Sequence, residues 1–254
     1  MDPDFNIGDY IMHHVQNRHQ WEVPFLPTIE LPEFLSLHGV MLIISAALLI
    51  IIFCGFYRKN ISVPTGITNF LELFVLFIRD QIATPFLGKE DGRKLTPLFC
   101  TFFFFILTLN LLGMIPIFST ATSNINVTGS LAVITFCFMV FGAIYKNGPV
   151  GFMKALIPSG VPAPILIILV PIEIFGLFIK AFALMIRLFA NMLAGHIIIL
   201  ALLGLVVILG VAALPAVALA IFISLLEVLV AFLQTYIFTL LSAMFIGQLY
   251  HPEH

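Results

Sequence analysis

Long apolar runs separated by short polar segments are the dominant pattern along the chain from about residue 38 onward. Most of these runs are long enough to cross about 30 Å of hydrocarbon as a helix. Clusters of charge, proline and glycine, such as Lys146–Pro149, mark their ends. The pattern predicts an all-α polytopic membrane protein with five spanning helices, at residues 39–57, 95–117, 130–145, 172–203 and 216–249.

Two segments do not fit this pattern. Residues 1–37 are polar and interrupted by prolines, which predicts an extramembrane N-terminal tail before an integral membrane domain at 38–254. Residues 61–94 are partly apolar but contain Glu72 and Arg79. They predict an amphipathic segment on the cytoplasmic side, either a helix or a short hairpin at the membrane surface rather than a span.

The last two apolar runs are longer than a perpendicular crossing needs. Residues 172–203 and 216–249 contain no proline, and as helices they would be about 48–51 Å long against about 30 Å of hydrocarbon. Tilts of about 20° cannot absorb this excess, so we expect steeply tilted helices. Gly204, Gly210 and Pro215 predict a turn between them. The two helices should therefore form a hairpin.

The composition supports the membrane assignment and excludes other classes. The 254 residues are 61% hydrophobic and 9% charged, whereas a soluble domain is roughly a quarter charged. The net charge of −2 and the scattered basic residues exclude a nucleic-acid-binding surface. The three cysteines lack metal-ligand or redox spacing, and we expect no cofactor. Acidic residues before the first apolar run also argue against a cleaved signal peptide.

The basic residues predict the orientation of the chain. Six of the eleven lysines and arginines lie between Arg58 and Lys94, and the loop at 119–130 has none. By the positive-inside rule the N-terminus is outside and the 58–94 segment is cytoplasmic. Five crossings then place the C-terminus in the cytoplasm.

Arg187 is the most informative single residue, because it lies in the long, otherwise apolar run Phe182–His196. A guanidinium keeps its proton in proteins, and at mid-membrane it costs about 2.5–3.5 kcal/mol on insertion scales. Such a charge is typical of an ion or substrate path. Glu173 and Lys180 precede it at a spacing of seven, and Asn191 follows by one turn, so all four share one stripe. Glu173 and Lys180 could equally be interfacial charges.

A second polar stripe lies on the final helix, where Glu227 and Gln234 share a face. In a hairpin this stripe would bring Gln234 close to Arg187 and Asn191, and Glu227 close to His196. Two interpretations remain open for each pair. Asn191 and Gln234 could supply only an interhelical hydrogen bond, and His196 and Glu227 could be a buried pair without a role in transport.

The segment Arg187–His196, with Leu after the arginine, Asn four residues on and Gly eight residues on, resembles the signature of subunit a of F-type ATP synthases. That subunit is the stator component facing the rotating ring of c subunits. Leu233–Phe238 matches the family's Leu-Gln-aromatic segment, and Asn124–Thr128 resembles its outward-facing loop. In this family the positions of His196 and Glu227 often hold a histidine and a carboxylate in either order. Because the histidine and the carboxylate can exchange positions while one of each is kept, the two residues are expected to handle protons as a coupled pair.

The resemblance implies a proton-translocating subunit with two aqueous half-channels. Arg187 would lower the pKa of the c-subunit carboxyl group and so remove its proton, and would also prevent a direct leak between the half-channels. Histidine and glutamate suit proton relay in the outer half-channel. The residues implied are Arg187, Asn191, His196, Glu227 and Gln234 for ion translocation, Asn124 and Asn126 on the outer side, and Glu173 and Lys180 toward the inner half-channel.

The implied partners are the c ring, b-type peripheral stalk subunits, the soluble F1 ATPase, membrane lipids and protons. The implied location is a bacterial inner membrane. The chain has no phosphate-binding loop of the Walker type, so ATP chemistry is expected in other subunits.

Two other classes of function remain open at this point. A free-standing secondary transporter or ion channel also carries intramembrane charges, although the chain lacks evident internal repeats. An intramembrane lipid transferase could use His196 as a base, but it would need more polar residues at the level of the headgroups. Purification separates these classes, because a stator subunit should be isolated together with a ring and an ATPase.

Overall fold

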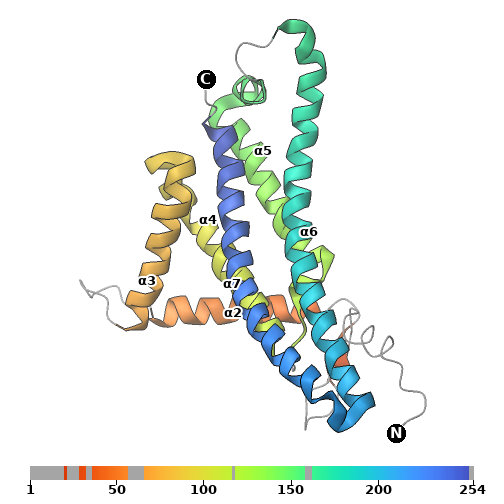
Figure 1. Cartoon of the computed structure of the whole chain (residues 1–254). Coiled ribbons are helices and arrows are strands. Elements are labelled where there is room, and N and C mark those ends of the chain that lie inside the picture. The colour runs from red at the N-terminus through yellow and green to blue at the C-terminus, as the bar shows by residue number, and fades with distance from the viewer. Residues whose placement is uncertain are drawn as a thin grey trace. The chain divides into compact units, whose positions relative to one another are not determined.

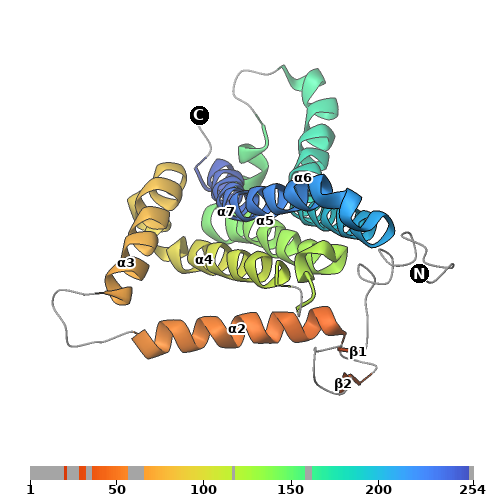
Figure 2. The same cartoon turned by 60° about the horizontal axis from the view of Figure 1, so that its bottom comes forward.

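The computed structural model describes residues 20–21, 29–32, 36–56, 66–115, 118–157 and 162–251. Most of the predicted tail at 1–37 therefore lies outside the described residues. Within the described ranges, two-residue strands β1 (Gln20–Trp21) and β2 (Ile29–Glu30) pair antiparallel. Figure 2 shows both strands near the N-terminal end of helix α2 (Leu37–Phe56). Nearly everything else is helical, so the predicted all-α class is confirmed.

Five helical stretches are long and apolar enough to cross a membrane, in agreement with the predicted number. They are separated by the polar or proline-containing connections that the sequence pattern marks as boundaries. The remaining elements are α3 (Ile67–Phe77), the π-helix η1 (Ile78–Ala83), α4 (Thr84–Gly113), the 3₁₀ helix η2 (Ala121–Ser123), α5 (Ile125–Ala155), α6 (Ala163–Leu209), the 3₁₀ helix η3 (Gly210–Ala213) and α7 (Leu214–Tyr250).

The segment predicted as amphipathic, 61–94, leads directly into the helix predicted at 95–117. Helix runs from Ile67 through η1 into α4, and a break at Gly88 (φ 73°, ψ 176°) divides α4 in two. A positive φ of this size suits glycine, which has no Cβ. Residues 67–87 and 89–113 thus form two consecutive helices. The first falls within the segment predicted to be an amphipathic helix or a short hairpin, and the second ends at Gly113 rather than at 117.

Helix α5 is also longer than the predicted range of 130–145. It begins at Ile125, just after Asn124, and contains a second break at Gly148 (φ 73°, ψ 167°). Pro149 follows the break, at the first position of the short helix that leads to Ala155. Proline fits there because the first amide groups of a helix need no partner within it.

Helix α6 runs for 47 residues and begins well before the predicted start at 172. It contains Pro171, which the prediction treated as a boundary. Proline removes one backbone donor from a helix, but helices in membranes tolerate it more often than soluble ones do. The turn that follows is η3, where Gly210 has φ 56°. Figure 1 shows α6 and α7 joined by this turn as a helical hairpin.

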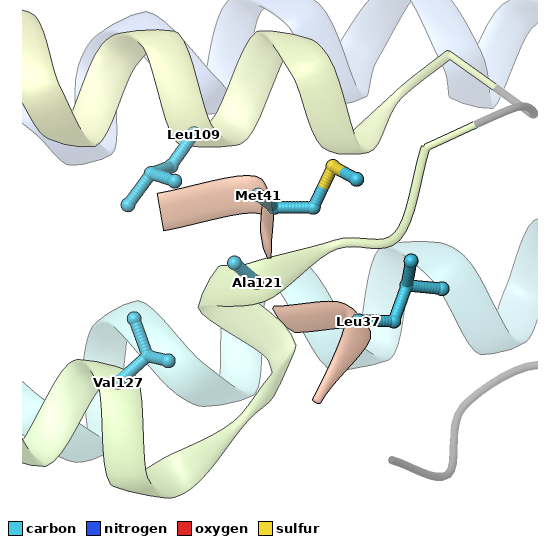
Figure 3. Packing of buried hydrophobic residues seen from close by; sticks show 5 residues of the cluster. All are labelled: Leu37, Met41, Leu109, Ala121 and Val127. Atoms are coloured by element: carbon cyan, nitrogen blue, oxygen red, sulfur yellow. The ribbon is translucent and has the colours of Figure 1, made fainter. Parts of the chain in front are cut away.

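The contacts divide the chain into two compact units. Unit 1 comprises residues 1–48, 105–128 and 187–234, and unit 2 comprises 49–104, 129–186 and 235–254. The core of unit 1 is a cluster contributed by four different elements, which fixes the η2 turn against the start of α2 (Figure 3). Its buried members are Leu37, Met41, Leu109, Ala121 and Val127.

In unit 2 a group of polar contacts joins α4, α5 and the end of α7. The Asp91 carboxylate accepts a hydrogen bond from Lys146, and His251 Nε2 lies 3.1 Å from Asp91 Oδ2. The same His251 nitrogen lies 2.8 Å from the carbonyl oxygen of Leu87. Asn147 Nδ2 donates to the carbonyl oxygen of Leu249 at 2.9 Å. These contacts hold three helix ends together.

Candidate functional site

Arg187 lies on α6 within unit 1, and its side chain is half-buried. None of the carboxylates in the described part of the chain is within ion-pairing distance of its guanidinium. A fixed positive charge on an apolar helix normally has a counter-ion or faces an aqueous path. Among the described residues, the guanidinium of Arg187 therefore has no ion-pair partner.

Asn191, one turn after Arg187, contacts the opposite arm of the hairpin. Its Nδ2 donates to Gln234 Oε1 on α7 at 2.8 Å. Gln234 is 2% exposed, and its Nε2 has no hydrogen-bond partner in the described part of the chain. A buried amide donor without a partner is costly, so this position suits a further polar ligand or water. The predicted contact between Asn191 and Gln234 is confirmed.

The second predicted pair is also in contact. His196 Nδ1 lies 3.1 Å from Glu227 Oε1, and Glu227 is 5% exposed. Gly195 makes room for this carboxylate, because a Cβ built there would lie 2.7 Å from Glu227 Oε1. A larger residue at this position would therefore require the Glu227 carboxyl group to shift.

Thr120 is a contact of His196 that the sequence reasoning missed. Its Oγ1 lies 2.6 Å from His196 Nε2 and 3.0 Å from the carbonyl oxygen of Gly113. The neighbouring Ser119 Oγ lies 3.0 Å from Nδ1 of His38, a buried residue of α2. The uncharged Ser/Thr-rich segment at 119–128 pointed to this region, but no pattern in it distinguished Thr120 from its neighbours.

Asn124 and Asn126, predicted for the outer side of the path, lie at the start of α5. Asn124 precedes α5, and its Oδ1 accepts a hydrogen bond from the backbone N–H of Asn126 at 2.9 Å. This is the usual arrangement of a residue that caps a helix N-terminus. Within the described residues neither side chain has a hydrogen bond to His196 or Glu227.

Glu173 and Lys180 lie on the part of α6 that belongs to unit 2. Lys180 Nζ donates to Gln248 Oε1 at 2.9 Å and lies 5.5 Å from the ring centroid of Phe245. Glu173 is half-buried and forms no ion pair with a described residue. Lys180 therefore has partners on α7 that the sequence reasoning did not identify.

The described residues contain no group of three or more His, Cys, Asp or Glu side chains placed to hold a metal ion. What the hairpin does offer is an arginine followed along the helix by a neutral amide pair and an acid–base pair. Histidine and glutamate can each bind and release a proton, and amides can orient water or a carboxylate. The arrangement is suited to proton transfer inside an apolar protein.

Comparison with known proteins places these residues in a family. The family model described as "ATP synthase A chain" matches residues 39–247. "ATP synthase subunit a" of Chloroherpeton thalassium is 46% identical and covers 96% of this chain and 77% of its own length. The protein of the same name from Myxococcus xanthus is 44% identical, and the match covers 93% of this chain and 81% of that protein's length.

A third relative, "ATP synthase subunit a" of Anaeromyxobacter dehalogenans, is 48% identical over 83% of this chain. The chain spans 56% of that relative's length. The match to the family model includes all five residues of the hairpin site, from Arg187 to Gln234. The chain belongs to the ATP synthase A chain family.

Proposed function

We propose that the chain is the proton-conducting stator subunit in the membrane sector of an F-type ATP synthase. It is a multi-pass membrane protein of the subunit a family, with five helices able to span a bilayer. In this proposal it provides two aqueous half-channels and the arginine that couples proton flow to rotation of a ring of c subunits. ATP synthesis itself occurs in a soluble F1 ATPase, to which b-type peripheral stalk subunits connect it.

Arg187 is the observation that carries this proposal. It lies on an apolar helix with no described carboxylate to neutralise it. A ring carboxylate that arrives beside Arg187 would lose its proton, because an opposite charge within about 4–6 Å lowers a carboxyl pKa by 1–3 units. An ionised carboxylate cannot enter lipid, so the ring advances only after a new proton has bound.

The two polar pairs supply the rest of the path. His196 and Glu227 are in contact inside unit 1 and can pass a proton between them. Asn191 and Gln234, which are bonded to each other, lie on the helix turn after Arg187 and on the opposite arm of the hairpin. They would orient the ring carboxylate or a water molecule beside the arginine. Glu173 and Lys180 would lie toward the inner half-channel.

Energetics favours a rotating ring over a fixed pore. One elementary charge crossing 100 mV delivers about 2.3 kcal/mol, so one ATP requires several protons. A ring accumulates such steps, whereas a single fixed channel does not. We place the chain in a bacterial inner membrane with the N-terminus outside, the C-terminus cytoplasmic and H⁺ as the ion.

The rival function is a free-standing secondary transporter or ion channel. Purification of the affinity-tagged chain in mild detergent separates the two. The proposal expects a ring of small membrane subunits and a soluble ATPase to copurify, and the reconstituted complex should acidify vesicles when ATP is added. Isolation of the chain alone, with ion transport that needs no other subunit, would contradict the proposal and support the rival.

A further inference from the structure

We propose that the Thr120 hydroxyl is a third member of the proton relay, positioning the proton of His196. The inference rests on the proposed function of the His196–Glu227 pair. Thr120 is 4% exposed and comes from the connection between α4 and α5, not from the hairpin. It contacts the ring nitrogen of His196 that faces away from Glu227.

The hydroxyl has one hydrogen and two acceptors competing for it. The carbonyl oxygen of Gly113 lies 3.0 Å from Thr120 Oγ1, and His196 Nε2 lies 2.6 Å from it. If the hydrogen points to Gly113, Oγ1 must accept a hydrogen bond from Nε2–H. If it points to Nε2, that nitrogen carries no proton. The direction of the Thr120 hydroxyl is therefore tied to the protonation of His196.

These two directions correspond to different numbers of protons on the pair. When Thr120 donates to Nε2, the single imidazole proton is on Nδ1 and is donated to an ionised Glu227. When Thr120 donates to Gly113, Nε2 is protonated, and the contact between Nδ1 and Glu227 Oε1 still needs a proton of its own. The pair then holds one proton more than before.

Proton uptake can be written as a balanced step. One H⁺ from the outer aqueous side binds to Nε2, forming an N–H bond, and the Thr120 hydroxyl rotates from Nε2 to the carbonyl of Gly113. The H⁺ comes from a hydronium ion, whose O–H bond breaks as the N–H bond forms; no other covalent bond changes, and the charge of the pair rises by one. Release of the proton shared by Nδ1 and Glu227 toward the ring, and return of the Nε2 proton to Nδ1 through water, restores the first state.

The position of the hydroxyl is fixed by packing as well as by hydrogen bonds. A Cβ built on Gly113 would lie 2.8 Å from Thr120 Cγ2 and 2.9 Å from Oγ1. The missing side chain of Gly113 therefore lets the methyl group and the hydroxyl of Thr120 sit against the end of α4. This packing also suggests a simpler role, in which Thr120 only stabilises the end of the helix.

Two substitutions separate the relay from that simpler role. Thr120→Val keeps the shape and the methyl group but removes the hydroxyl, and Thr120→Ser keeps the hydroxyl but removes the methyl group. In the complete complex in membrane vesicles, we expect Thr120→Val to lower ATP-driven proton transport about tenfold, the loss that corresponds to one hydrogen bond. Thr120→Ser should stay within about twofold of the unaltered complex.

The chain offers a matched control in Thr122. Thr122 lies in η2, which begins directly after Thr120; it is 0% exposed, and its hydroxyl has no hydrogen-bond partner in the described part of the chain. Thr122→Val should therefore leave transport unchanged. Transport by Thr120→Val equal to that of Thr122→Val, or a larger loss in Thr120→Ser than in Thr120→Val, would overturn the proposal.

If Thr120→Val fails to assemble with an active ATPase, Thr120→Ala replaces it and is compared with Thr120→Ser, since both lack the methyl group. Equal transport by these two variants would also overturn the proposal.

Arg187→Ala measured in parallel distinguishes this failure from failure of the proposed function. Retained coupling in Arg187→Ala contradicts the function, and with it the relay. Loss of coupling in Arg187→Ala with normal transport in the variants lacking the hydroxyl contradicts the relay alone.

Discussion

At the scale of single residues, the absence of a side chain at Gly195 is as important to the site as the charges beside it. A Cβ there would lie 2.7 Å from Glu227 Oε1 and 3.0 Å from its carboxyl carbon. The acid is therefore seated against the backbone of α6, one residue before the histidine that it contacts. One helix position makes room for the acid, and the next supplies the base.

Gly195→Ala should displace Glu227 and lower ATP-driven proton transport by at least about tenfold, because small displacements of a reacting group cost up to about 100-fold. Gly176→Ala is the matched control on the same helix, where an added Cβ would meet no atom within 4 Å. The control should transport protons normally. The rate of vesicle acidification measures proton transport by both variants. Equal rates would show that the position of the Glu227 carboxyl group does not depend on Gly195.

At the scale of elements, an ion pair connects the two helix breaks at glycine. Asp91 follows the break at Gly88, and Lys146 precedes the break at Gly148. Gly88 and Gly148 have φ 73°, and Asp91 and Lys146 lie within three residues of them. The ion pair, together with His251, joins the two bends and the end of α7 in unit 2. The glycines permit the bends, and the polar contacts select one arrangement of the helices that they connect.

Asp91→Asn should lower the free energy of unfolding by about 1 kcal/mol, the upper end for ion pairs that retain contact with solvent. The Asp91 side chain is 19% exposed and contacts both Lys146 and His251, which favours this upper end. Glu90→Gln is the control, because Glu90 pairs with Lys94 at an 84% exposed position. Thermal unfolding in detergent should show a lower melting temperature for Asp91→Asn and an unchanged melting temperature for Glu90→Gln. Identical melting temperatures for the two variants would contradict a stabilising role.

At the scale of the whole molecule, α6 and α7 are the least buried of the five helical stretches able to cross a membrane. The most apolar windows of α6 and α7 are 11% and 17% buried, compared with 44% for the stretch Ile67–Gly113. Apolar faces of this extent need lipid or another membrane subunit to cover them. The proposed c ring and the bilayer would share this surface, with the polar site on the ring side.

The proposed orientation predicts which side of the membrane reaches each end of α5. Asn126 and Tyr145 are both exposed and lie at opposite ends of one apolar helix, about 28 Å apart at 1.5 Å per residue. After replacement of the three native cysteines, Asn126→Cys should react with a membrane-impermeant maleimide added outside the cell. Tyr145→Cys should react only in inverted vesicles. The reverse pattern would contradict the orientation.

The helices and the contacts across the hairpin could be predicted from the sequence because both depend on local periodicity. The two residue pairs, Asn191 with Gln234 and His196 with Glu227, follow from 3.6 residues per turn on two helices joined by a turn. Helix ends were less predictable. Pro171 lies inside α6, because proline weakens a helix without always ending it.

Thr120 could not be predicted in this way. Its contact with His196 joins residues 76 apart in the sequence and depends on how the α4–α5 connection packs in three dimensions. The same segment holds several other serine and threonine hydroxyl groups, and nothing in the local sequence shows which of them contacts His196. Asn124 was predicted for the path from the family resemblance, and that role stays a prediction; the structure adds that its side chain caps α5. The resemblance drew attention to this segment, but only the packing shows that Thr120 contacts His196.

Arg187 is the most direct test of the account, measured as ATP-driven proton transport and ATP synthesis in membrane vesicles carrying Arg187→Ala or Arg187→Lys. The account predicts that Arg187→Ala abolishes coupled transport while the assembled ATPase still hydrolyses ATP. Arg187→Lys should transport poorly, because lysine keeps the charge but loses the planar, permanently protonated guanidinium. Normal coupling in both variants, with the complex intact, would contradict the central claim that this arginine couples proton flow to the ring.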